Sequence, residues 1–130
     1  MKFDHIGIVT KDLSFVVKNF TKNFNVTKIS KTIIDKNLGI KLVFLNVENI
    51  TYEILTPLTK ISPINNVLKK NINIINHIAY KVKNFDKKII EYQKNGFFLI
   101  NKPKKSIAFN NKRVVFFMSN MNFIIELIEA

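Results

Sequence analysis

The chain has 130 residues, 47% of them hydrophobic, which allows a buried core and excludes intrinsic disorder. It has no cysteine, so disulfides and thiolate metal sites are excluded. The net charge of +12 comes from lysines spread along the sequence, with Arg113 as the single arginine. Nucleic-acid recognition relies on arginine forks and aromatic stacking surfaces, so we expect an anionic small-molecule partner and no nucleic acid.

No apolar run approaches the ~18 residues that a membrane span requires. The start of the chain, MKFDH, also lacks the charged-then-apolar pattern of a signal peptide, because Asp4 and His5 interrupt it. We therefore expect a soluble cytoplasmic protein with no membrane partner.

The first half of the chain predicts a strand over residues 3–9, followed by a helix over 13–24 that Asp12 can cap. The helix is predicted from apolar residues at positions 13, 16, 17, 20 and 24, which form one stripe at helical spacing. Gly39 supplies a turn between later strands. Three strands are expected to close this half: 27–34, 40–46 and 50–55.

The second half predicts the same order of elements. A crossover over residues 58–72, with a short helix at 64–70, leads to a strand at 76–82. Asn84 or Asp86 can cap a second helix that runs to about Asn95, and Gly96 is a typical residue after a helix end. Three further strands are expected: 97–101, 112–118 and 123–129.

The two halves are also similar residue by residue. FDHIGIVTKDL (3–13) aligns with INHIAYKVKNF (75–85), which sets His5 over His77 and, at the same shift, Phe44 over Phe116. TYEIL (51–55) aligns with IIELI (124–128). Two such copies are too few for a solenoid, so they predict one pseudo-twofold α+β domain built from two βαβββ repeats, about 1–57 and 73–130.

Four residues in these repeats are candidates for binding a metal ion. His5 and His77, the only histidines, lie in the first strand of each repeat, and Glu53 and Glu126 lie in the last. A carboxylate inside an apolar strand costs several kcal/mol unless it is paired or bound to metal. A lone strand histidine or glutamate is usually structural, but two equivalent pairs favour one shared divalent ion: Co²⁺, Mn²⁺, Ni²⁺, Zn²⁺ or Fe²⁺.

The motifs YEILTPL, SPI, NHIAYKV and IIELIEA resemble those of the glyoxalase, or vicinal-oxygen-chelate, superfamily, and most of all its methylmalonyl-CoA epimerases. The resemblance covers nearly the whole chain. It implies a single domain over 1–130, with an open eight-stranded curved sheet around a central metal cavity and the helices outside. It also implies a homodimer, and it sets the family's four metal ligands on His5, Glu53, His77 and Glu126.

The activity implied by the resemblance is a metal-dependent isomerase or epimerase that removes a proton next to a carbonyl, with the metal stabilising an enolate. Glu126 would be both a ligand and one base. The family's second base, a glutamate just before the glycine matching Gly39, is absent here, because Lys36 and Asn37 occupy those positions. Asp35 is the only acid nearby and is the candidate for this role.

Other activities fit the same superfamily, because one fold hosts many chemistries. A lactoylglutathione lyase, another lyase or transferase, and a non-catalytic protein that binds a small ligand are the alternatives. If the substrate is an acyl-CoA or a similar anion, its phosphates require cations. The densest candidates in the sequence are Lys69-Lys70, Lys104-Lys105 and Lys112-Arg113.

Overall fold

The computed structural model describes residues 1–70 and 72–130, so one position of the predicted crossover, residue 71, lies outside the described residues. The chain forms two compact units. The first unit comprises residues 5–76, and the second comprises residues 1–4 together with 77–130. We name them the N-unit and the C-unit and describe each by itself.

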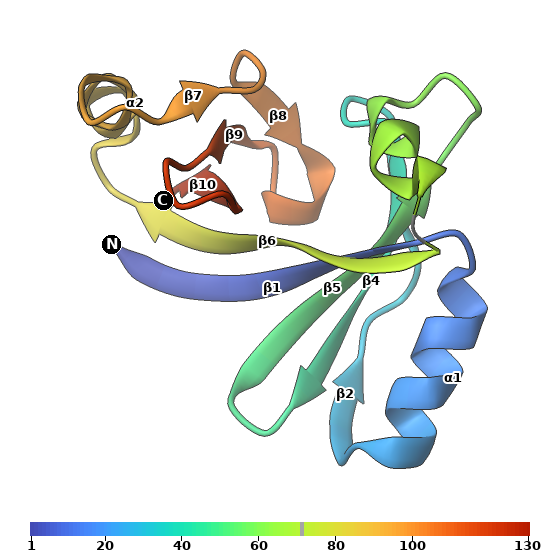
Figure 1. The fold of residues 1–130 in the computed structure, drawn as a ribbon. Coiled ribbons are helices and arrows are strands. Elements are labelled where there is room, and N and C mark those ends of the chain that lie inside the picture. Colours follow the sequence, from blue (N-terminus) through green and yellow to red (C-terminus); the bar gives the residue numbers. More distant parts are fainter. Residues whose placement is uncertain (71) are drawn as a thin grey trace. The chain divides into compact units, whose positions relative to one another are not determined.

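The elements of the first repeat and crossover are β1 (Lys2–Thr10), α1 (Leu13–Asn23), β2 (Val26–Ile29), β3 (Ile33–Asp35), β4 (Ile40–Val47), β5 (Ile50–Pro57) and the 3-10 helix η1 (Pro63–Lys69). The sheet of the N-unit has the strand order β2-β4-β5-β1 (Figure 1). The short β3 pairs with β4. Strands β1 and β5 are parallel, whereas β4 pairs antiparallel with β2, β3 and β5.

The C-unit repeats this pattern. Its elements are β6 (Asn73–Val82), α2 (Phe85–Lys94), β7 (Phe98–Leu99), β8 (Lys104–Ser106), the 3-10 helix η2 (Ile107–Phe109), β9 (Lys112–Met118) and β10 (Ile124–Glu129). The strand order is β6-β10-β9-β7, with the short β8 paired to β9, and β6 and β10 are parallel. Strand β9 pairs antiparallel with β7 and β10.

The expected α+β class and the two βαβββ repeats are therefore confirmed, with two short strands more than predicted in the described residues. The predicted strand 27–34 divides into β2 and β3, because its three residues 30–32 lie opposite only two residues of β4, 43 and 44. In this irregular stretch the Ser30 hydroxyl accepts the backbone N–H of Phe44 at 2.9 Å. The predicted strand 97–101 is shortened to β7. Pro103, which has no N–H to donate, separates it from β8.

Each helix covers one face of its own sheet. Asp12 caps α1 as predicted, its carboxylate accepting the Phe15 N–H at 3.0 Å. The apolar stripe of α1 packs through Val16 on Val43, Leu45 and Ile54 of the sheet. In the C-unit, Phe85, Ile89 and Tyr92 at α2 pack on β9 and β10 in the same way. None of the helices in the described residues is long and apolar enough to cross a membrane.

The turn before β4 explains why Gly39 and the SPI motif occur together. Gly39 has φ +68°, a left-handed conformation that favours glycine. A Cβ at this position would lie 3.0 Å from the hydroxyl oxygen of Ser62, which is itself buried. The Leu58 N–H also donates to the Gly39 carbonyl at 2.9 Å. The crossover is thus held against this turn of the N-unit.

Candidate metal centre

Strand register places the site residues of the N-unit on the sheet face that α1 does not cover. Gly7 of β1 stands opposite Glu53 of β5, and Phe44 of β4 stands opposite Glu53 on the other side. Because side chains alternate along a strand, His5 shares this face with Gly7 and Glu53. The neighbouring residues of opposite parity, such as Ile54, face α1.

His5 and Glu53 form a buried pair on this uncovered face. The Nε2 of His5 lies 3.8 Å from Oε2 of Glu53, and the two residues are only 0% and 3% exposed. The ring of Phe44 meets the imidazole edge to face, with centroids 5.9 Å apart and planes at 72°. The phenylalanine thus restricts the orientation of the imidazole beside the carboxylate.

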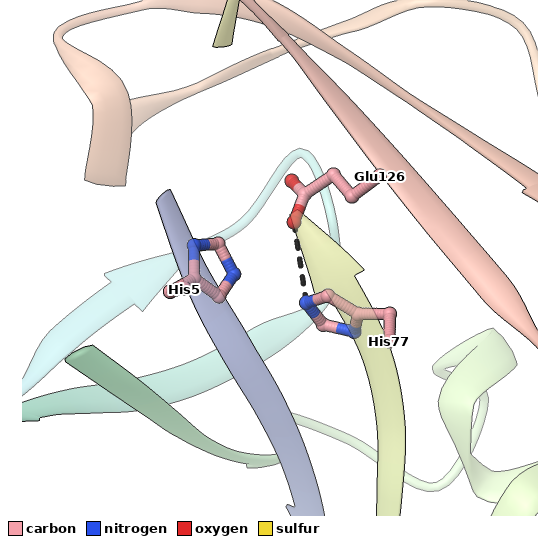
Figure 2. Close-up of side chains that lie close together, drawn as sticks. All are labelled: His5, His77 and Glu126. Atoms are coloured by element: carbon pink, nitrogen blue, oxygen red, sulfur yellow. Dashed lines mark ion pairs between the residues drawn. The ribbon is translucent and has the colours of Figure 1, made fainter. Parts of the chain in front are cut away.

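His77 and Glu126 form the equivalent pair of the C-unit, drawn with its ion pair dashed in Figure 2. The Nε2 of His77 lies 3.2 Å from Oε2 of Glu126, and these residues are 2% and 1% exposed. Phe116 meets the imidazole edge to face, with centroids 5.4 Å apart and planes at 80°. Figure 2 also labels His5, which belongs to the N-unit.

The two pairs are built by the same register. In each unit the residue two positions after the histidine, Gly7 or Ala79, stands opposite the glutamate in a parallel ladder. The phenylalanine stands opposite the same glutamate in an antiparallel ladder. Both of these residues opposite the glutamates, Gly7 and Ala79, are small. Because the same arrangement of histidine, glutamate and phenylalanine occurs in both units, we infer that the two pairs have the same role.

The geometry of each pair fits metal ligation. Two ligand atoms that share one Zn²⁺ at bonds of about 2.1 Å lie roughly 3.0–3.4 Å apart. The His77–Glu126 separation of 3.2 Å falls within this range, and the His5–Glu53 separation of 3.8 Å is a few tenths longer. Imidazole nitrogen and carboxylate oxygen together suit the late first-row divalent metals. The residues present therefore fit such an ion.

Asp35, the candidate second base, is buried on the same face of the N-unit as His5 and Glu53. It is 1% exposed and stands opposite Ile40, which in turn stands opposite Pro57 on β5. Pro57 has the parity of Glu53 but lies four residues further, about 13 Å along the strand. The Asp35 carboxylate accepts the Leu38 N–H at 3.1 Å, which fixes its orientation at the end of β3.

Ser106 is a site candidate that sequence analysis missed. It is 0% exposed and ends β8 as Asp35 ends β3, and each of these short strands pairs with the start of the following long strand. Lys104 stands opposite Val114, and Glu126 stands opposite Phe116. Because Val114 and Phe116 point to the same face of the sheet, Ser106, which has the parity of Lys104, lies on the same face as Glu126. The repeat offset from Asp35 was the signal that could have revealed this serine.

One of the predicted phosphate-binding pairs, Lys112-Arg113, is used within the C-unit instead. The Arg113 guanidinium donates to both carboxylate oxygens of Asp86 at 2.9 Å and to Glu129 at 2.8 and 3.1 Å. It also lies over the ring of Phe85, 4.8 Å from the centroid. Lys112 donates to the Ala130 carbonyl at 3.2 Å. This arginine ties the start of α2 to β10, so it is not available for a ligand.

The Arg113 network predicts a loss of stability in acid. Hydrogen bonds from Arg113 lower the pKa of Glu129 to about 2 and also lower the pKa of Asp86. A carboxylate whose pKa is lower in the folded state stabilises it above the unfolded pKa, near 4.5 for Glu129, and loses this effect as pH falls toward 2. We expect Arg113→Gln to have a lower Tm than the wild type at pH 6, with the difference shrinking between pH 5 and 2.5.

Differential scanning fluorimetry across this pH range measures the effect. Lys94→Gln removes one exposed positive charge from the end of α2 without touching either carboxylate, and serves as the control. If the difference in Tm between wild type and Arg113→Gln stayed constant as the pH fell, the proposed linkage to Glu129 and Asp86 would be wrong.

Comparison with known proteins supplies a family. Residues 4–117 match the family model described as the Glyoxalase/Bleomycin resistance protein/Dioxygenase superfamily. The chain is 28% identical over 116 residues to a protein named mitochondrial methylmalonyl-CoA epimerase of Homo sapiens. That match covers 88% of this chain and 65% of the human protein, so the chain spans under two thirds of the length of this relative.

Solved structures share the fold. A hypothetical protein from Bacillus halodurans C-125 is 29% identical, with a TM-score of 0.85 over 99% of this chain and 94% of the other. The methylmalonyl-CoA epimerase from Mycobacterium tuberculosis is 23% identical, with a TM-score of 0.83 over 98% and 87% of the two chains. The second likeness concerns the fold alone.

Proposed function

The chain belongs to the Glyoxalase/Bleomycin resistance protein/Dioxygenase superfamily, and we propose that within it the protein is a metal-dependent epimerase acting next to the carbonyl of an acyl-CoA ester, with methylmalonyl-CoA as its substrate. The observation that carries the proposal is the pair of buried histidine and glutamate side chains built identically in both units. The name of the human relative supports the choice of substrate.

In this proposal one divalent ion is held jointly by His5, Glu53, His77 and Glu126. Such an ion, when bound, supplies Lewis-acid stabilisation of negative charge that develops on a carbonyl oxygen. The side chains provide two neutral and two anionic ligands, so they neutralise a divalent charge while the surroundings stay buried. The homodimer and the cytoplasmic location expected from the resemblance stay predictions.

Glu126 and Asp35 are the proposed bases. Inversion at a carbon next to a carbonyl requires one group to remove the α-proton and another to return a proton to the opposite face. Glu126 is buried, and its Oε2 lies 3.2 Å from Nε2 of His77. Asp35 is supported by its burial on the uncovered face of the N-unit and by the Leu38 N–H that orients it. Its level at Pro57, about 13 Å along the strand from Glu53, is the observation against this role.

Deuterium exchange tests this function directly. Purified protein, supplied in turn with Co²⁺, Mn²⁺, Ni²⁺, Zn²⁺ and Fe²⁺, is incubated with one enantiomer of methylmalonyl-CoA in D₂O. We expect incorporation of deuterium at the α-carbon and formation of the other enantiomer, measured by mass spectrometry and chiral analysis, above a control without protein. Absence of both with every metal would overturn the proposal. Thiol-dependent turnover of a glutathione adduct would support the lyase alternative instead.

A further inference from the structure

A cleft of about 530 Å³ opens in the N-unit beyond the end of β5. Its walls carry three exposed lysines, Lys11, Lys60 and Lys69, and the described residues that line it include no carboxylate. Buried Leu68 contributes an apolar part of the lining. Three cations around one concave surface, without a compensating acid, favour the binding of a multiply charged anion.

The walls of the cleft are held in place by backbone contacts. The side-chain amide of Asn65 donates to the carbonyls of Thr59, Lys60 and Ser62 at 2.8, 3.1 and 2.9 Å. The Lys11 N–H donates to the Ile72 carbonyl at 2.9 Å. A ligand would thus meet a preformed surface, and only the lysine side chains would have to become ordered on binding.

The position of the cleft relates it to the His5–Glu53 pair of the same unit. Thr56 and Pro57 both line the cleft, which therefore lies at the end of β5, and Pro57 has the strand parity of Glu53. Four residues of strand separate them, about 13 Å. The pantetheine arm of coenzyme A, when extended, separates a thioester from the nearest phosphates by a comparable length. A thioester beside Glu53 would therefore bring its phosphates to the lysines.

We propose that this cleft binds the phosphate groups of the coenzyme A portion of the substrate, through Lys11, Lys60 and Lys69. The proposal rests on the proposed function for the identity of the ligand, and it assigns the recognition of phosphate to side chains distinct from the metal ligands and bases. It also places Lys69 of the sequence candidate Lys69-Lys70 in a defined cleft.

Calorimetric binding of coenzyme A tests the cleft without any turnover. The variant Lys11→Gln/Lys60→Gln/Lys69→Gln should raise the Kd roughly 10-fold or more at low salt, because each exposed charge contributes a modest amount that adds to the others. The control variant Lys18→Gln/Lys22→Gln/Lys28→Gln removes three exposed lysines from α1 and β2 of the same unit and should change the Kd less than twofold.

Two further probes distinguish the source of the affinity. Inorganic pyrophosphate should compete with coenzyme A, whereas acetyl-pantetheine, which lacks phosphate, should bind wild type and cleft variant equally. Equal Kd values of coenzyme A for the cleft and control variants would overturn the proposal, as would failure of wild-type protein to bind coenzyme A. If the cleft variant binds coenzyme A weakly while wild-type protein exchanges no α-proton, the cleft is supported and the epimerase proposal fails.

Discussion

Purified wild-type protein is expected to hold about one divalent ion per chain, and His77→Ala is expected to hold almost none. The imidazole of His77 is 2% exposed and lies 3.2 Å from the Glu126 carboxylate, so its removal takes one of four proposed ligands from a buried site. Binding at a free metal concentration 100-fold above the Kd stabilises a fold by about 2.7 kcal/mol. For a chain of this size, chelation should then lower the wild-type Tm by roughly 10 °C.

The stoichiometry separates a shared centre from two independent sites. If both units contribute to one ion, His5→Ala and His77→Ala each abolish binding, as measured by inductively coupled plasma mass spectrometry. Two ions per wild-type chain, with one retained in each variant, would show that each pair acts alone. The Tm of the metal-free proteins provides the control, because a variant defective only in ligation unfolds near the temperature of metal-free wild type.

Glu126→Gln is expected to reduce exchange of the substrate α-proton by 10²–10⁴-fold, the usual contribution of a positioned general base. The amide preserves the size of the side chain, but it has neither the basicity nor the charge of the carboxylate. Metal affinity should therefore fall together with exchange. Retention of full exchange by Glu126→Gln would remove this residue from the mechanism.

Asp35→Asn should have a different effect, because Asp35 is not a proposed ligand. The amide oxygen can still accept the Leu38 N–H, so the turn after β3 should be preserved. We expect unchanged metal content, continued deuterium exchange with one enantiomer, and inversion slowed by 10²-fold or more. An unchanged inversion rate would show that Asp35 is not the second base and would favour a relative with another substrate.

Asp12→Asn is the matched control for these two variants. Asp12 is exposed and caps α1 through the Phe15 N–H, a role that asparagine performs equally well. It removes one carboxylate from the N-unit without changing the site face. Its exchange rate, inversion rate and metal content should therefore equal those of wild type.

The sequence by itself was sufficient for the repeated architecture. Apolar spacing predicted α1, and the candidate caps Asn84 and Asp86 together with Gly96 predicted α2. Asp12 was correctly identified as the cap of α1. The alignment of His5 over His77 predicted that the two histidines would lie on equivalent faces of their sheets, because side chains alternate from face to face along a strand. The same alignment set Phe44 over Phe116, although it could not say that these rings would pack against the two imidazoles.

Only the tertiary structure decided which residues meet. Register places Glu53 opposite Gly7 and Glu126 opposite Ala79, and register depends on contacts between strands far apart in the chain. The same long-range contacts bury Ser106, which has no distinctive local pattern, and commit Arg113 to Asp86 and Glu129. They also gather three scattered lysines around one cleft. Helix and strand propensity depends on neighbouring residues and can be recognised in the sequence. These long-range contacts form only when segments far apart in the chain pair with one another.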